Sequence, residues 1–278
     1  MNLRDGLLLG RVSNLPTVRA NMLAGMVLAC GILALSGLAL VGLAFTLVYL
    51  GGMCFNDAFD ADIDAEEHPE RPIPAGRTSR QTVYTAGYSM LFAGLGFLGY
   101  LAHAGAHGLL PLWAGIALAL AIVTYDAYHK SNPLSPLIMG LCRMLVYVAA
   151  GALVAVQLGA TLWLEAAACL AWLIGLTYVA KQENLGAGQK PVAACVSWCA
   201  NHLWFLCRIR GGLAGLDLAV WALVRLRFVV RRRPGDIPRA VVSLVVGISL
   251  LDARLIAGAG QSMLALVAVT SFVLTLLL

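Results

Sequence analysis

Half of the fourteen acidic residues in this 278-residue chain fall within fifteen consecutive positions, 56–70. If a helix runs through this segment, each residue advances about 100° around the helix axis. Asp57, Asp60 and Asp64 then share one face within about 60° of one another, while Asp62 points almost the opposite way. Three carboxylates on one face repel each other unless a cation bridges them. Mg2+ is the natural candidate, because this hard ion is usually held by one or two carboxylates together with a substrate's phosphates.

The acidic segment continues directly into Arg71-Pro72-Ile73-Pro74-Ala75-Gly76-Arg77. Two prolines and a glycine predict a turn, which holds Arg71 beside the acidic face. Because a guanidinium matches phosphate oxygens bidentately, the acids and Arg71 together indicate recognition of Mg2+ and a diphosphate. The alternative is a solvated acidic loop that only marks a membrane boundary. Acids at the end of an apolar helix are costly without a function, which favours the first interpretation.

The composition places these residues in a membrane protein. Sixty per cent of the residues are apolar and 12% are charged, whereas soluble domains have about 45–50% and about 25%. A single core of this length cannot hide so much apolar surface, so much of the chain must face lipid. We therefore expect one integral-membrane domain over residues 1–278, an all-α polytopic bundle of about nine or ten spans. The apolar runs predict spans at 16–35, 37–56, 79–101, 108–126, 136–157, 161–180, 191–207, 212–230, 239–257 and 260–278.

The basic residues predict the orientation of this bundle. They precede the first span and recur in every second loop, at Arg71, then Lys130, then Lys181, whereas the loops between have no Lys or Arg. By the positive-inside bias, the N-terminus and these three loops face the cytoplasm, and we expect the plasma (inner) membrane and no cleaved signal peptide. From residue 208 onward nine arginines stand against three aspartates. The same bias explains this basic tail without a nucleic-acid partner.

The acids, the trailing Arg-Pro and the glycine fall in the order of a known motif. The segment resembles the first aspartate-rich motif of the UbiA-type intramembrane prenyltransferases: Asn56-Asp57-x-x-Asp60-x-x-x-Asp64, then His68-Pro69-Glu70-Arg71-Pro72-Ile73-Pro74-Ala75-Gly76. The resemblance implies an all-helical intramembrane enzyme that transfers a prenyl group from an isoprenoid diphosphate to a lipophilic, often aromatic, acceptor, with Mg2+ as cofactor and membrane lipids around it. It also implies metal and diphosphate ligands at Asn56, Asp57, Asp60 and Asp64, with Asp57 and Asp60 catalytic and Arg71 a charge partner in substrate binding.

The second charged loop adds candidates near Tyr125-Asp126-Ala127-Tyr128-His129-Lys130. The family usually has a tyrosine and a lysine four residues apart here, and neither tyrosine has that spacing to Lys130. We expect Lys130 to contact the diphosphate and Asp126 to add to the metal site. Tyr128 or Tyr125 would stabilise a carbocation through its ring face, or would belong to an aromatic belt at the lipid interface.

Arg143 and the third charged loop leave alternatives open. Arg143 lies about two turns into a span, where an unpaired charge is expensive, so it binds substrate in a cavity or joins an ion pair. The third loop has one acid, Glu183, where the family has a second run of aspartates, and Lys181 as a phosphate contact. Three interpretations remain open: one Mg2+ held mainly by the first loop, a second Mg2+ bound weakly by Glu183, or a divergent member whose chemistry has changed. The same departure motivates an alternative function, a non-catalytic protein that binds or helps traffic a lipid or small metabolite.

Other residues of metal-binding type have simpler interpretations. Cys195, Cys199 and His202 fall in an apolar stretch, where buried thiols pack as small hydrophobes. His103 and His107 supply only two ligands, so we interpret them as part of a solvated loop. An odd number of cysteines, seven, in mostly apolar stretches argues against a disulfide framework.

Overall fold

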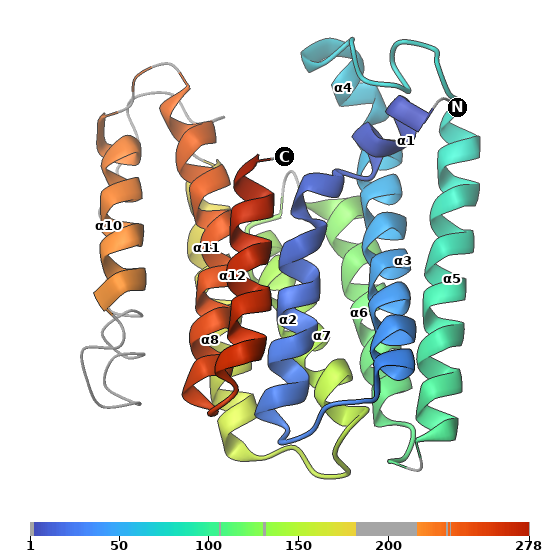
Figure 1. The fold of residues 1–278 in the computed structure, drawn as a ribbon. Coiled ribbons are helices and arrows are strands. Elements are labelled where there is room, and N and C mark those ends of the chain that lie inside the picture. Colours follow the sequence, from blue (N-terminus) through green and yellow to red (C-terminus); the bar gives the residue numbers. More distant parts are fainter. Residues whose placement is uncertain are drawn as a thin grey trace.

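The computed structural model describes residues 3–105, 107–129, 132–181, 216–231, 233 and 235–277. Within these ranges the chain forms helices and no strands, as the sequence predicts. Figure 1 shows the long helices side by side in one bundle. The helices are α1 Leu3–Leu9, α2 Leu15–Leu28, α3 Leu35–Phe59, α4 Ala61–Glu67, α5 Arg80–Ala104, α6 Leu110–Tyr128, α7 Ser135–Ala152, α8 Ala160–Lys181, α10 Leu216–Arg231, α11 Asp236–Gly258 and α12 Ser262–Leu277, with a short 3-10 helix at Val12–Asn14.

Six of the described helices are long and apolar enough to cross a membrane: α3, α5, α6, α7, α8 and α11. Helix α12 is apolar but has 16 residues. The total of nine or ten spans stays a prediction, since the span expected at 191–207 lies outside the described residues. The first span, expected at 16–35, is shorter than predicted. Helix α2 ends at Leu28, Cys30 takes a left-handed φ of 62°, and the next helix begins only at Leu35.

The charged segments gather at one end of the bundle. Helices α3, α6 and α8 run toward this end and α5, α7 and α11 run away from it, so α4 and the 68–79 turn lie above the helix ends in Figure 1. His129 follows α6 at the same end, and Lys181 is the last residue of α8. The first charged loop and the described residues that border the other two therefore lie at one end of the bundle. Their cytoplasmic location stays a prediction.

Small residues let these helices approach closely. A Cβ on Gly94 of α5 would lie 2.8 Å from the carbonyl oxygen of Ala44 on α3. A Cβ on Gly25 of α2 would lie 2.6 Å from the carbonyl oxygen of Tyr147 on α7. Packing of this kind is typical of membrane helices, where lipid supplies no hydrophobic drive between helices and close van der Waals contact takes its place.

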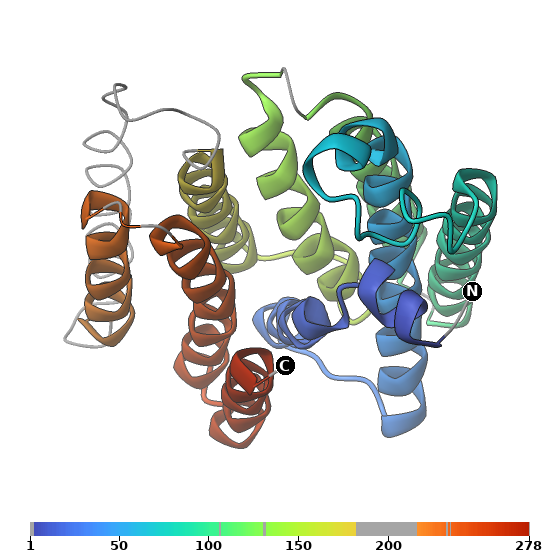
Figure 2. The ribbon, with the colours of Figure 1, turned by 90° about the horizontal axis from the view of Figure 1, so that it is seen from above.

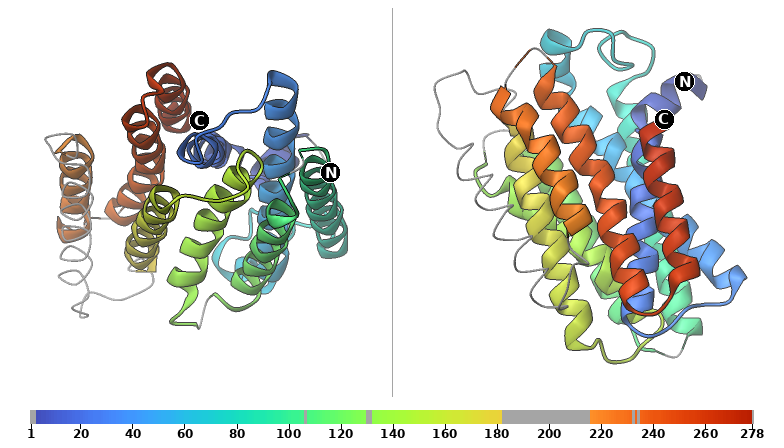
Figure 3. Two further views of the ribbon diagram at one scale, coloured as in Figure 1. Left: turned by 90° about the horizontal axis from the view of Figure 1, so that it is seen from below. Right: turned by 60° about the vertical axis from the view of Figure 1, so that its left-hand side comes forward.

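Helix α2 occupies the middle of the bundle, although it is short. It packs against α3, α7, α11 and α12, helices that lie far apart in the sequence. Viewed along the helix axes, α5 and α10 stand at opposite edges while α2 lies between α3 and α12 (Figures 2 and 3). Side chains on α2 can therefore connect the first half of the chain with the last.

Candidate active site

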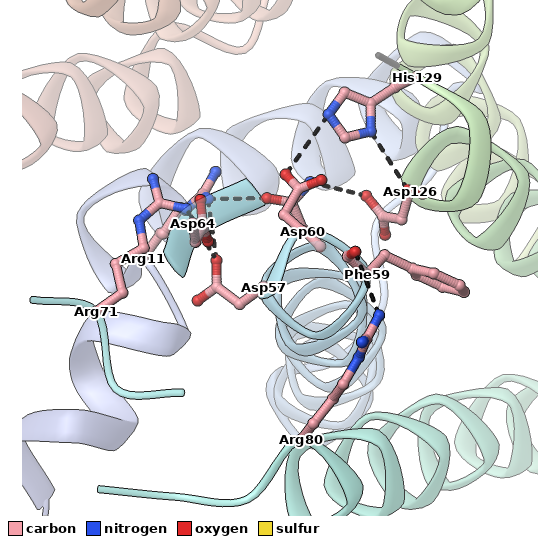
Figure 4. Close-up of polar contacts among 10 residues, drawn as sticks. Arg11, Asp57, Phe59, Asp60, Asp64, Arg71, Arg80, Asp126 and His129 are labelled. Carbon is pink, nitrogen blue, oxygen red and sulfur yellow. Dashed lines mark hydrogen bonds and ion pairs between the residues drawn. The ribbon is translucent and has the colours of Figure 1, made fainter. Parts of the chain in front are cut away.

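The acidic segment is nearly continuous helix, as its spacing predicts. Helix α3 ends at Phe59, α4 begins at Ala61, and Asp60 caps both. Asp57, Asp60 and Asp64 are buried, with 6%, 7% and 2% of their surface exposed, whereas the Asp62 side chain is 83% exposed. These exposed fractions confirm the predicted division of the acids between an inner and an outer face, and Figure 4 shows the three inner acids.

Arg71 reaches these acids because the turn after α4 folds back over them. Its Nη1 donates to Asp64 Oδ2 at 2.6 Å and lies 3.8 Å from Asp57 Oδ1. The turn is closed by the amide of Arg71 donating to His68 O, and it passes through Gly76 at a φ of 70°, a conformation that favours glycine. The position of Arg71 beside the acidic face agrees with the sequence prediction.

A second guanidinium, Arg11, reaches the same acids from the N-terminal segment. Arg11 Nη2 donates to Asn56 Oδ1 at 2.8 Å and lies 3.2 Å from Asp57 Oδ1 (Figure 4). The Tyr49 hydroxyl donates to the carbonyl oxygen of Arg11 at 3.0 Å and ties this segment to α3. The sequence analysis missed Arg11, because a basic residue before a first span is indistinguishable from an ordinary topology signal.

Asp126 and His129 complete the group from the end of α6. Asn56 donates from Nδ2 to Asp126 Oδ1 at 3.1 Å, so its amide links Arg11 on one side with Asp126 on the other. His129 Nε2 lies 3.6 Å from Asp60 Oδ2 (Figure 4). The sequence analysis also missed His129, although its spacing of three residues from Asp126 would have placed both on one helix face.

The structure separates the other predicted residues into three groups. Tyr125 lines a cavity below the acids and stacks on His129 with ring centroids 5.0 Å apart. Tyr128, predicted to be catalytic, is 66% exposed and is not among the residues that line that cavity. Tyr128 is the last residue of α6, and its exposure shows that its ring does not face the bundle interior. Lys130 and Glu183 lie outside the described residues, and Lys181 is described only as the last residue of α8.

The cavity leads from the acids into the bundle. Its volume is about 360 Å³, and six helices contribute to its walls: α2, α3, α6, α7, α8 and α11. Arg11, Asn56 and Asp126 line it beside the acidic cluster, and Arg143 lines it from α7. The other walls are mainly apolar, including Phe45, Val48, Ile122, Met139, Leu173 and Ile248. The cavity thus has a charged end and apolar walls. A molecule that carries a polar head group and an apolar chain would match it.

The chemistry of the acids fits Mg2+, although the acids do not form a complete cage for it. Among the described residues no three His, Cys, Asp or Glu side chains converge as a metal cluster. Asp57 and Asp64 instead face the guanidiniums of Arg11 and Arg71. The donors are hard oxygens, and Asp126 Oδ2 is buried without a hydrogen-bond partner in the described part of the chain. Mg2+ commonly takes one or two carboxylates and completes its shell with waters and substrate phosphates, which suits this arrangement.

The chain is thus an intramembrane helical bundle with an acidic and basic cluster above an apolar cavity. It belongs to the UbiA prenyltransferase family, whose model matches residues 20–245. A digeranylgeranylglyceryl phosphate synthase of Methanoregula boonei is 36% identical over 124 residues, which make up 44% of this chain and 39% of that protein. The chloroplastic chlorophyll synthase of Oryza sativa subsp. japonica is 47% identical over 60 residues, or 22% of this chain and 14% of that protein. The matches therefore span well under half the length of these curated relatives.

Solved structures share the fold over nearly the whole chain. A structure concerning digeranylgeranylglyceryl phosphate synthase in membranes has a TM-score of 0.66 at 18% identity and covers 92% of this chain and 98% of that one. A UbiA homologue from Archaeoglobus fulgidus bound to GPP and Mg2+ has a TM-score of 0.64 at 14% identity, covering 92% of this chain and 99% of that one. These likenesses establish the UbiA-type fold. The six membrane-length apolar helices and the family membership support an integral, multi-pass membrane protein.

Proposed function

We propose that this protein transfers a prenyl group from an isoprenoid diphosphate to a lipophilic acceptor within the membrane, with Mg2+ as cofactor. The observation that carries the proposal is the contact of Asp57 with Arg11 and Arg71, beside Asp60 and His129, in a cluster that adjoins a mainly apolar cavity through Arg11. A prenyl diphosphate likewise combines a charged head group with an apolar chain. The family membership, and the GPP and Mg2+ held by a relative of the same fold, support the assignment.

Each part of the cluster has a task in this reaction. Asp57 and Asp60 would hold Mg2+, and Asp126 offers a further carboxylate oxygen. Bound Mg2+ would stabilise the negative charge that develops on the departing diphosphate. Arg11 and Arg71 would bind diphosphate oxygens, and Asp64 would orient Arg71 through their 2.6 Å contact. The apolar walls would hold the prenyl chain and exclude water, and the Tyr125 ring would stabilise positive charge on its reacting end.

The relatives suggest which acceptors to test first. One is named as a digeranylgeranylglyceryl phosphate synthase and another as a chlorophyll synthase. A prenylglyceryl phosphate lipid is therefore the first acceptor for a panel, followed by aromatic and tetrapyrrole acceptors. We propose that the reaction takes place at the cytoplasmic face of the plasma membrane, because the charged loops meet at one end of the bundle.

The test is product formation by membranes that contain the protein, supplied with labelled prenyl diphosphates of several lengths and the acceptor panel. With Mg2+ we expect diphosphate release and a prenylated acceptor, and with excess EDTA we expect neither. Asp57→Asn and Asp60→Asn should each lower the rate by about 10² or more. Asp62→Asn is the matched control, since this carboxylate is in the same segment but 83% exposed, and it should keep the rate within about twofold.

Two outcomes would contradict the proposal. One is that no diphosphate is consumed under any combination of substrate and acceptor. The other is that both inner-face variants remain as active as the Asp62 control. Tight Mg2+-dependent binding of a prenyl diphosphate without any product would instead support the non-catalytic alternative.

A further inference from the structure

A second polar network lies inside the bundle, formed by three helices that are distant in sequence. Asp252 on α11 is fully buried. Asn21 on α2 donates from Nδ2 to Asp252 Oδ2 at 2.7 Å, and the hydroxyl of Tyr147 on α7 donates to Asp252 Oδ1. Asp252 also lies beyond residue 245, where the match to the family model ends. None of the tasks assigned above to the cluster around Asp57 uses this carboxylate.

The network continues through Asn21 to the wall of the cavity. Arg143 Nη1 donates to Asn21 Oδ1 at 2.7 Å, and Arg143 Nη2 donates to Thr17 Oγ1 at 3.0 Å. Thr17 and Asn21 are one helical turn apart and both are fully buried. The amide of Asn21 therefore stands between a carboxylate and a guanidinium and hydrogen-bonds to both. Arg143 also lines the cavity.

Stability of the bundle alone does not account for this arrangement. Burying a carboxylate and a guanidinium costs several kcal/mol of desolvation for each ion, and apolar residues of similar size commonly do as well or better. Charged side chains inside a membrane protein most often serve binding or transport. A guanidinium fixed through both Nη atoms and facing a cavity is a pre-oriented cation for an anionic group.

We infer that Asp252 is a positioning residue, which acts through Asn21 to hold the Arg143 guanidinium at the cavity wall, where Arg143 binds an anionic group of a substrate. The inference rests on the proposed function, since it assumes that the substrates of that reaction fill the cavity. The anionic group is a phosphate or carboxylate, carried either by the acceptor or by the prenyl diphosphate. Asp252 has no contact with the substrate itself.

The test is steady-state kinetics of Asp252→Asn and Asn21→Ala with each substrate varied in turn. Geranyl diphosphate is the donor probe, and a prenylglyceryl phosphate is the acceptor probe. We expect KM to rise about tenfold for the substrate that carries the anion, as for loss of one charge-assisted hydrogen bond, and kcat to change less than about threefold. Thr17→Val, which removes one acceptor of Arg143 without touching Asp252, should raise the same KM by a smaller factor.

The two sources of the anion give different results. An increase confined to the KM of the prenylglyceryl phosphate places the anion on the acceptor, and one confined to the KM of geranyl diphosphate places it on the donor. Two control variants separate positioning from stability. Tyr147→Phe removes a contact to Asp252 but leaves the link from Asn21 to Arg143. Ser249→Ala removes a fully buried hydroxyl from the same helix. Both should leave both KM values within about twofold, whatever their effect on thermal stability.

The inference is overturned if the Asp252 and Asn21 variants fold and keep both KM values, or if Tyr147→Phe raises KM as much as they do. Wild-type turnover in the same preparation tests the proposed function separately. The same variants are also compared by the thermal shift that each probe induces in the purified protein. This measurement reports binding whether or not the protein turns over, so it tests the positioning role even if no product forms.

Discussion

The ion pair of Arg71 and Asp64 provides a quantitative test of how the acidic segment is held. The Asp64 side chain is 3% exposed, and Arg71 Nη1 lies 2.6 Å from its Oδ2, with 31% of the Arg71 side chain exposed. At an effective dielectric constant of about 20, two unit charges at this distance attract by roughly 6 kcal/mol before desolvation is subtracted. Removing one partner of a buried pair typically costs about 3–5 kcal/mol. Because Arg71 keeps partial contact with solvent, we expect Arg71→Ala to cost about 2–3 kcal/mol.

The predicted effects of the two single substitutions differ. Arg71→Ala leaves a buried carboxylate without the cation it faces, whereas Asp64→Asn leaves a half-buried guanidinium that still lies 3.8 Å from Asp57. In detergent-solubilised protein, the midpoint temperature of thermal unfolding should fall by about 5–10 °C for Arg71→Ala. It should fall by less for Asp64→Asn. The double variant should be more stable than the sum of the single effects predicts, by about 2 kcal/mol of coupling.

The exposed pair of Arg80 and Asp62 is the matched control for this cycle. Its N···O distance is similar, 2.9 Å, but its side chains are 39% and 83% exposed. The substitutions Arg80→Ala and Asp62→Asn should show a coupling energy of about 0.5 kcal/mol or less. Equal coupling energies in the two cycles, or strictly additive effects at Arg71 and Asp64, would refute the claim that burial makes the inner pair strong.

Two further predictions concern packing and orientation. Gly25→Ala should sharply reduce the yield of monodisperse protein in size-exclusion chromatography, because a Cβ there would lie 2.6 Å from the carbonyl oxygen of Tyr147. Gly42→Ala should be tolerated, since a Cβ at Gly42 meets no atom within 4 Å, and equal yields would contradict the close packing of α2 and α7. In a variant that keeps only Cys30, which is exposed and follows the end of α2 that lies away from α4 in Figure 1, a membrane-impermeant maleimide should label intact cells. A lone cysteine from Glu70→Cys in the charged loop should react only after lysis, and the reverse pattern would overturn the predicted cytoplasmic side.

Much of the candidate site could be predicted because its signals are local. The helical period alone divides Asp57, Asp60 and Asp64 from Asp62, and the structure shows that division in burial. The turn chemistry of the 72–76 segment likewise placed Arg71 correctly. Composition together with the long continuous apolar runs was enough to predict an all-helical membrane bundle, because a run of about 20 apolar residues crosses lipid as a helix that satisfies its own backbone hydrogen bonds. An aspartate within the apolar stretch that became α11 was also visible in the sequence, and its cost in a membrane could have singled out Asp252.

Only the tertiary structure decided which distant residues meet. Arg11 contacts Asn56 across 45 positions, Asn56 contacts Asp126 across 70, and Asn21 contacts Asp252 across 231. Periodicity determines which face of a helix a side chain occupies, but not which helix packs against that face. That choice depends on the close approach of small residues such as Gly25, and on the position of the short helix α2 among α3, α7, α11 and α12. The sequence by itself thus determined the membrane bundle and the acidic face, while the packing of the helices determined the cation partners of that face and the cavity below it.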